Sequence, residues 1–171
     1  MQSMPRYPHQ TRLLQQVKTA PKPLQAWLLA QGSLTKQLTT FANGQFRVQV
    51  IANGWQKLDT VTAQRLGCRP QQLAWVRESF LFGSSHLPWV KARSIIPMPS
   101  LQKQARIFRY IRQRPMGKIL FFRQNPTGQR WCDKTQLGYA RQSCYLWQGC
   151  QVLVEEIFLD AFQQFLNKTA E

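Results

Sequence analysis

The sequence predicts an α+β fold, with a single antiparallel β-sheet and short helix-turn-helix pairs packed over it. Two pairs of strand-like segments are joined by turn residues, 73–82 with 89–97 and 139–147 with 151–158. Strands that follow one another through short turns pair antiparallel. The chain shows no strand–helix–strand pattern with a phosphate-binding loop, which would indicate a parallel sheet. Its 171 residues are the length of one domain.

The N-terminal elements begin after a polar segment. Residues 1–20 are expected to form a loosely ordered arm, and residues 21–171 a single domain. Pro23 suits the first turn of a short helix over 23–29. Ser33 is placed to cap a second helix. The apolar residues that share one face of this second helix are Leu34, Leu38 and Phe41.

The next segments alternate in a pattern typical of a strand. Asn-Gly pairs at 43–44 and 53–54 predict turns on either side of a strand over 45–50. A single helical turn is expected near 62–66. The residues of the strand that are expected to face inward are Phe46, Val48 and Val50.

The C-terminal half adds two helices and one further apolar run. Ser100 is placed to cap a helix that Pro115 ends. An apolar run over 117–122 and a polar turn at 125–128 follow. Asp160 is placed to cap a last helix. The side chains of that helix expected to face inward are Phe162, Phe165 and Leu166.

The charge balance is strongly basic. Lys and Arg number 23 against 7 Asp and Glu, a formal net charge of +16. This balance predicts an anionic partner, either nucleic acid, a membrane surface or a small polyanion, and charge alone does not choose among them. The hydrophobic content of 43% favours a packed core over a disordered basic tail.

The inventory of ligating residues argues against a metal site. Carboxylates are few, and only Glu155 and Glu156 are adjacent, on opposite faces of a strand. No two cysteines have C-x-x-C spacing. Because the first twenty residues lack an apolar segment, we expect no signal peptide, a cytoplasmic protein and reduced cysteines.

Glu156 is the most informative acid. Period-two alternation over 151–158 places Glu156 on the face of Val152, Val154 and Phe158, which is the more apolar face. A carboxylate that points inward needs a partner or a function. The pattern leaves open a structural ion pair, a strand end that reaches water, and a functional group.

Arg77 is the corresponding cation. It lies in a strand among aromatic residues and shares a face with Trp75, Ser79 and Leu81. It suits an anion clamp and, equally, a surface arginine stacked on Trp75. Arg93 in the partner strand has the same ambiguity. The basic outer side of the expected helix over 101–114 is typical of a solvated face, or of contact with anionic lipid or nucleic acid.

Several short motifs occur in the order found in a known family. They are Trp27-Leu28-Leu29 with Ser33-Leu34-Thr35-Lys36, Trp75-Val76-Arg77-Glu78, Pro88-Trp89 with Ala92-Arg93-Ser94-Ile95-Ile96-Pro97, Arg114-Pro115-Met116-Gly117-Lys118-Ile119-Leu120-Phe121, Tyr139-Ala140-Arg141-Gln142-Ser143, and Glu156-Ile157-Phe158-Leu159. With them the chain resembles the chorismate pyruvate-lyase family over about residues 24–160.

The resemblance implies an enzyme that needs no cofactor and splits chorismate into 4-hydroxybenzoate and pyruvate, the first step toward ubiquinone in bacteria. It also implies an enclosed site on one antiparallel α+β domain. Two helix-turn-helix flaps would cover the site, corresponding to 23–42 and to the region around 101–118. Slow product release, and so product inhibition, is expected of such a closed site.

The resemblance also assigns roles to residues. Arg77 would pair with the ring carboxylate and Glu156 would hydrogen-bond the 4-hydroxyl. Arg93 would serve the enolpyruvyl carboxylate or support the site. The backbone groups that would help hold the carboxylate end are those at Leu34, Met116 and the adjacent Gly117. The family's aromatic-Gly-Arg-Arg-Ser stretch is degraded here to 139–143, and a structural role is expected for Arg141.

Two rival functions follow from the same features. One is a non-catalytic ligand-sensing domain of the same fold, and the other is a basic module that binds nucleic acid. Under the enzyme interpretation the partner is the chorismate dianion, with no nucleic acid and no metal. We then expect a monomer that makes at most weak peripheral contact with an anionic membrane.

Overall fold

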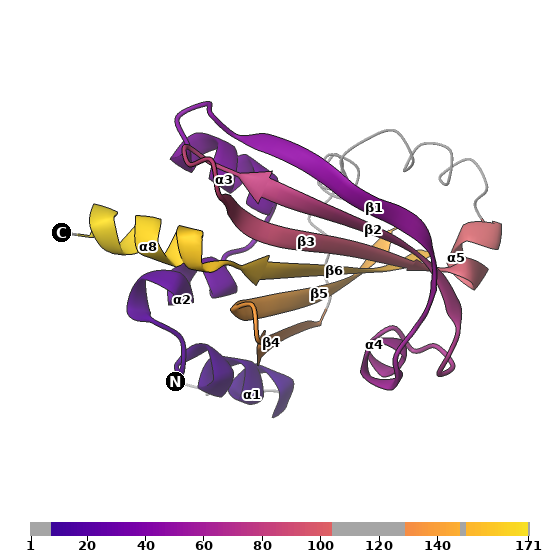
Figure 1. The fold of residues 1–171 in the computed structure, drawn as a ribbon. Helices are drawn as coiled ribbons and strands as arrows, with labels where there is room; N and C mark the ends of the chain where they lie inside the picture. Colours follow the sequence, from indigo (N-terminus) through magenta and orange to yellow (C-terminus); the bar gives the residue numbers. More distant parts are fainter. Residues whose placement is uncertain (1–7, 104–128, 148–149, 171) are drawn as a thin grey trace.

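The computed structural model describes residues 8–103, 129–147 and 150–170, which form one six-stranded antiparallel sheet flanked by helices (Figure 1). The strand order is β1-β2-β3-β6-β5-β4. The predicted α+β class and both predicted hairpins are confirmed. The strands are β1 (Arg47–Lys57), β2 (Leu73–Phe82), β3 (Pro88–Pro97), β4 (Arg130–Lys134), β5 (Tyr139–Trp147) and β6 (Cys150–Phe158).

The helices gather at the two ends of the sheet. Helices α1, α2, α3 and α8 lie at one end, and α4 and α5 lie at the other (Figure 1). Their bounds are α1 (Pro8–Val17), α2 (Lys22–Leu29), α3 (Leu34–Phe41), α4 (Thr60–Arg65), α5 (Met98–Lys103) and α8 (Asp160–Thr169).

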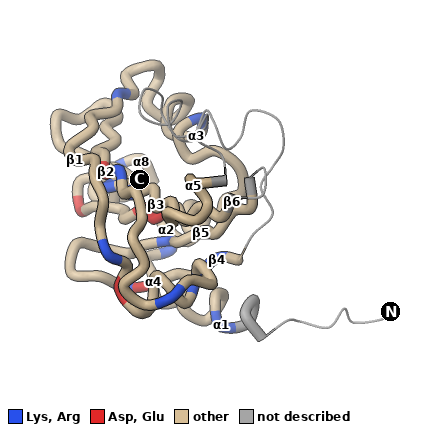
Figure 2. Tube along the Cα trace, turned by 90° about the vertical axis from the view of Figure 1, so that its right-hand side faces the viewer, with Lys and Arg blue, Asp and Glu red and all other residues tan. Residues whose placement is uncertain are grey.

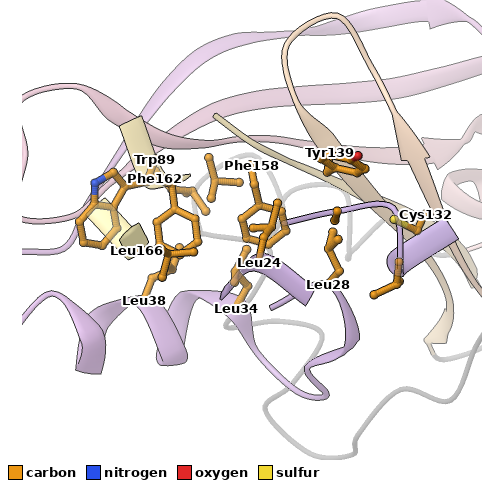
Figure 3. Close-up of a cluster of buried hydrophobic side chains, with 14 of the residues drawn as sticks. Leu24, Leu28, Leu34, Leu38, Trp89, Cys132, Tyr139, Phe158, Phe162 and Leu166 are labelled. Carbon is orange, nitrogen blue, oxygen red and sulfur yellow. The ribbon is translucent and has the colours of Figure 1, made fainter. Parts of the chain in front are cut away.

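The larger part of the core lies on one face of the sheet, which we call the front face. Residues paired across adjacent antiparallel strands point to the same side. Leu81, Val90, Phe158 and Tyr139 form such a row across β2, β3, β6 and β5. Figure 3 shows side chains from α2, α3 and α8 packed on part of this row. The helical residues labelled there are Leu24, Leu28, Leu34, Leu38, Phe162 and Leu166.

A smaller core lies on the opposite, back face. Here Ala63 and Leu66, from α4 and its C-cap, pack on Val76, Ile95 and Leu153 of the sheet. Helix α4 begins after Asp59, whose carboxylate accepts hydrogen bonds from the Thr62 N–H at 2.9 Å and the Thr62 hydroxyl at 2.6 Å. The helical turn expected near 62–66 is therefore present.

The structure differs from the expectation of a loose arm over residues 1–20. Residues 8–17 form α1, and Val17 and Ala20 are buried in the front core. Leu13 packs against the same cluster. The i, i+4 spacing of Leu13 and Val17 gives the helix an apolar side, which is the physical reason that it docks.

The expectations for the first strand were wrong in two respects. The Asn53–Gly54 pair makes no turn, because β1 continues through it and pairs with Arg77 and Val76 of β2. Val48 and Val50 are 36% and 41% exposed. Strand β1 lies at the edge of the described sheet, so alternation alone did not reveal that little covers its apolar side.

The C-terminal half holds further differences. Helix α5 begins at Met98, so Ser100 lies inside it rather than at its cap, and the remainder of the helix expected over 101–114 lies outside the described residues. The run over 117–122 lies outside them too. Helix α8 begins at Asp160, with Leu159 as its N-cap. Strand β4 was not predicted.

Candidate active site

Two neighbouring rows of the front face carry polar side chains. In the first row, Arg77 of β2, Ser94 of β3, Val154 of β6 and Ser143 of β5 are paired in turn. The second row, two residues away along each strand, is made of Ser79, Ala92, Glu156 and Arg141. Arg77 and Glu156 therefore lie on the same face of the sheet, next to the apolar row under the helices.

Glu156 points inward, as its place in the alternation predicts. Its side chain is 13% exposed, and its Oε2 accepts a hydrogen bond from Nε of Arg141, the residue paired with it on β5. Arg141 is 1% exposed. The guanidinium and the carboxylate compensate each other's charge in a place with little water.

Arg141 also contacts the helix that covers this end of the sheet. Its Nη1 donates to the carbonyl oxygens of Trp27, at 2.7 Å, and Ala30, at 3.1 Å. These carbonyls belong to the last turn and C-cap of α2. The C-terminal carbonyls of a helix have no hydrogen-bond donor within the helix and carry partial negative charge. A buried cation there donates hydrogen bonds to them and offsets their charge.

A second arginine binds the same helix end. Nη1 of Arg130 donates to Ala30 O at 2.7 Å and lies 3.4 Å from Leu28 O, while its Nε donates to the Ser143 hydroxyl at 3.0 Å. Burial, and then the neighbouring Arg141 cation, lower the pKa of Arg130 below its usual value. Arg130 and Arg141 together fix the end of α2 over the site.

Arg77 is buried at the middle of β2, with 9% of its surface exposed. Burial lowers the pKa of this guanidinium, which nonetheless remains charged at neutral pH. Strand β3 separates β2 from β6. At the usual spacing between strands, the backbones that carry Arg77 and Glu156 are thus about 10 Å apart across the sheet.

Leu34 lies on the same side of the sheet, as the first residue of α3. The Ser33 hydroxyl accepts a hydrogen bond from the Lys36 N–H at 3.3 Å, so the predicted cap is present. The Leu34 side chain is buried in the front core (Figure 3). The N–H groups of a first helical turn have no partner within the helix, which leaves the backbone here suited to an anion.

The structure does not bring Arg93 together with Arg77 and Glu156. Arg93 pairs with Glu78 and Glu155, the back-face neighbours of those two residues, and so points to the back face. Its Nε lies 3.0 Å from Glu78 and its Nη1 lies 3.3 Å from Glu155. Met116 and Gly117 lie outside the described residues.

Sequence reasoning did not find the contacts of the buried Arg141 and the half-buried Arg130 with the end of α2. Arg141 was expected to be structural, and Arg130 was not singled out because strand β4 was not recognised. Strand alternation carried one usable indication, since Arg141 shares a face with Tyr139, Ser143 and Tyr145.

Within the described ranges there is no group of three His, Cys, Asp or Glu side chains that could hold a metal ion. The same part of the chain holds no helix long and apolar enough to cross a membrane.

Comparison with solved structures gives distant likenesses. A GntR-family transcriptional regulator from Enterococcus faecalis V583 has a TM-score of 0.47 at 8% identity, covering 67% of this chain and 94% of the regulator chain. The ligand-binding domain of a GntR-family regulator from Bordetella bronchiseptica has a TM-score of 0.45 at 10% identity, covering 68% of this chain and 84% of that chain.

Sequence comparison gives much closer relatives. A protein from Acinetobacter baylyi named "probable chorismate pyruvate-lyase" is 43% identical over 158 residues, which are 92% of this chain and 94% of the relative. A protein of the same name from Acinetobacter baumannii is 45% identical over 154 residues, covering 90% and 91% of the two chains. The profile of the chorismate lyase family matches residues 11–169, so this chain belongs to the chorismate lyase family.

Proposed function

We propose that this protein is a chorismate pyruvate-lyase, which converts chorismate to 4-hydroxybenzoate and pyruvate. The observation that carries the proposal is the placement of Arg77 and Glu156 on one face of the sheet, with strand β3 between their strands. Family membership and the names of its relatives support the same activity.

The dimensions of the substrate support these roles. The ring carboxylate and the 4-hydroxyl of chorismate are at opposite ends of a six-membered ring. Arg77 pairs with the carboxylate, for which its planar fork of N–H donors is suited. Glu156 accepts a hydrogen bond from the 4-hydroxyl. Both side chains stand on the front face, on strands about 10 Å apart, a separation on the scale of one substrate ring with its substituents.

The reaction needs little from the protein beyond position and charge. The bond between C3 and the enolpyruvyl oxygen breaks with its electron pair on the oxygen, and C4 loses its hydrogen as a proton, so that the ring becomes aromatic. The departing enolpyruvate takes up a proton and becomes pyruvate. Because aromatisation drives the elimination, no nucleophile or cofactor is required. The protein selects a reactive conformation of chorismate and stabilises the departing enolpyruvate through its cations.

The Arg141–Glu156 pair fits this chemistry. The hydrogen bond from Arg141 occupies Oε2 of Glu156, and the guanidinium offsets the charge of the carboxylate. Oε1 is then left to accept a hydrogen bond from the 4-hydroxyl of chorismate. Since Arg141 also binds the carbonyls of Trp27 and Ala30, the orientation of Glu156 depends on α2 being in place.

The remaining site residues have supporting roles in the proposal. The backbone at Leu34, with that at Met116 and Gly117, helps hold the carboxylate end of the substrate. Arg93, which forms ion pairs on the back face, supports the site and does not contact the enolpyruvyl group.

The setting of the enzyme completes the proposal. The reaction is the first step of ubiquinone biosynthesis, in the cytoplasm, by a monomer that 4-hydroxybenzoate inhibits. Basic positions are scattered over the described elements (Figure 2). They raise the local concentration of the chorismate dianion and allow weak contact with an anionic membrane surface.

The test is an assay with purified protein and chorismate, with chelator added and no cofactor. Formation of 4-hydroxybenzoate and pyruvate in equal amounts is the expected result. A protein that binds chorismate without turnover is a ligand sensor, and the lyase proposal then fails. A protein that instead binds DNA or RNA with a steep dependence on salt overturns it as well.

A further inference from the structure

A chain of polar side chains crosses the back face of the sheet directly behind the site. Glu155 accepts hydrogen bonds from Nη1 of Arg93, at 3.3 Å, and from Nε2 of Gln142. The Gln142 Oε1 in turn accepts a hydrogen bond from Arg65 of α4, at 2.5 Å. Arg65 also donates to both oxygens of Asp133, at 2.7 and 3.3 Å.

The two central members of this back-face network are chain neighbours of site residues. Glu155 precedes Glu156, and Gln142 follows Arg141. Because successive side chains of a strand point to opposite faces, Glu155 and Gln142 lie on the back face directly behind Glu156 and Arg141. Gln142 and Glu155 are themselves paired across β5 and β6. A change in this bond therefore moves the backbones that carry the Arg141–Glu156 ion pair.

The network concentrates the scarce acids of the chain. Three of the seven carboxylates, Glu78, Glu155 and Asp133, lie in it against three cations, Lys91, Arg93 and Arg65. Its centre is the least exposed part, with Gln142 at 8% and Glu155 at 9%. A charge-balanced and connected set with a buried centre holds its central members in one geometry.

An amide is the side chain that position 142 requires. Arg65 and Arg93 stand at the two ends of the central segment and can only donate. Between them, the carboxylate of Glu155 accepts twice, and the amide of Gln142 donates to Glu155 and accepts from Arg65. Carboxylates at both 142 and 155 would repel each other. Amides at both positions would place one N–H donor against another, either between the two amides or between an amide and an arginine.

We propose that Gln142 is a positioning residue for the active site, acting with Arg65 through Glu155 to set the place of Glu156 and its Arg141 partner. This inference rests on the proposed lyase function for its kinetic consequence. It goes beyond that function by assigning a role to the back face, which does not contact the substrate.

The test exchanges the two central side chains. In Gln142→Glu two carboxylates face each other, and in Glu155→Gln two amides do. In the double variant Gln142→Glu/Glu155→Gln the new carboxylate accepts from Arg65, and the new amide donates to it while accepting from Arg93. Every hydrogen bond is restored with the original net charge. The Arg69→Gln variant, at an exposed position outside the network, is a control for purification and assay.

Two readouts apply to each variant, at a temperature where unfolding curves show it fully folded. The first is the kcat and KM for chorismate. We expect kcat to fall about tenfold or more in each single variant, with a smaller change in KM, because displacement of the Glu156 carboxylate slows the chemical step. In the double variant kcat returns to within about threefold of the wild type, because one carboxylate and one amide again form a hydrogen bond between positions 142 and 155.

The second readout does not depend on turnover. It is the NMR signal of the Arg141 Nε–H, which the bond to Glu156 shifts downfield. We expect this signal to move in both single variants and to return in the double variant. If the wild type turns over no chorismate, the proposed function fails and this signal still decides the positioning role. Single variants that keep both the wild-type kcat and the wild-type signal overturn the inference, as does a double variant that restores neither.

Discussion

Replacing Arg141 with methionine is expected to destabilise the protein strongly. The change keeps most of the side-chain volume and removes the guanidinium. It leaves the Glu156 carboxylate without its partner and removes the donor to the carbonyls of Trp27 and Ala30. Removing one partner of a buried ion pair costs about 3–5 kcal/mol, because the remaining charge stays out of water. For a chain of this size, that is a fall in Tm of roughly 10 °C.

The measurement is urea unfolding followed by tryptophan fluorescence, in the wild type and in a Glu156→Gln background. In that background no bare carboxylate is left behind, so Arg141→Met is expected to cost about 1–3 kcal/mol less than in the wild type. Arg69→Met, at an exposed position, is the matched control and is expected to change the free energy of unfolding by less than about 0.5 kcal/mol.

The reasoning is refuted if Arg141→Met costs less than about 1 kcal/mol, the scale of an exposed ion pair. It is also refuted if the cost is the same in both backgrounds. The first result would mean that the site is open to water. The second would mean that Arg141 supports α2 alone and does not stabilise the ionised Glu156.

Three further predictions follow from particular positions. Asp59→Ala is expected to lower the free energy of unfolding by about 1 kcal/mol, the worth of an N-cap. Burial raises the pKa of Asp59, but its hydrogen bonds, chiefly those from Thr62, together lower it by more, so the net shift is downward. The difference in stability is therefore present above the usual carboxyl pKa and disappears as the pH falls through the lowered value, as acid titration of both proteins would show. Burial, and then Asp133, raise the pKa of the Cys132 thiol to about 11, so mass spectrometry should find it unmodified by iodoacetamide at pH 8 in the folded protein and modified in urea. Gly138→Ala is expected to lower the free energy of unfolding by about 2 kcal/mol or more, because φ is +146° and the new Cβ would lie 2.1 Å from Phe158 O. A stable Gly138→Ala variant in thermal unfolding, or rapid labelling of native Cys132, would contradict the packing described here.

Strand alternation predicted the parts of the site that depend on one strand alone. It placed Glu156 with Val154 and Phe158, and it placed Arg77 with Ser79, and the structure has both groups on the front face. These positions could be predicted because a half-buried strand has a strict period of two, and the period does not depend on what the strand pairs with.

The parts that depend on several elements could not be predicted in the same way. The partner of Glu156 lies 15 residues away along the chain and is brought opposite by the register of β5 and β6. Arg93 alternates as well as Arg77 does, and only the pairing of the strands reveals that the two point to opposite faces. The exposure of β1 follows from its place at the sheet edge, which no residue of β1 encodes.

The most direct test of the proposed active site compares two arginine variants in the chorismate assay. Arg77→Ala removes the buried front-face cation, and Arg69→Ala removes the same side chain from an exposed position. We expect kcat/KM to fall about 100-fold or more in Arg77→Ala with the fold intact by circular dichroism, and to stay within about twofold of the wild type in Arg69→Ala. Wild-type turnover in a folded Arg77→Ala protein would contradict the assignment of the front face as the place where chorismate is bound and split.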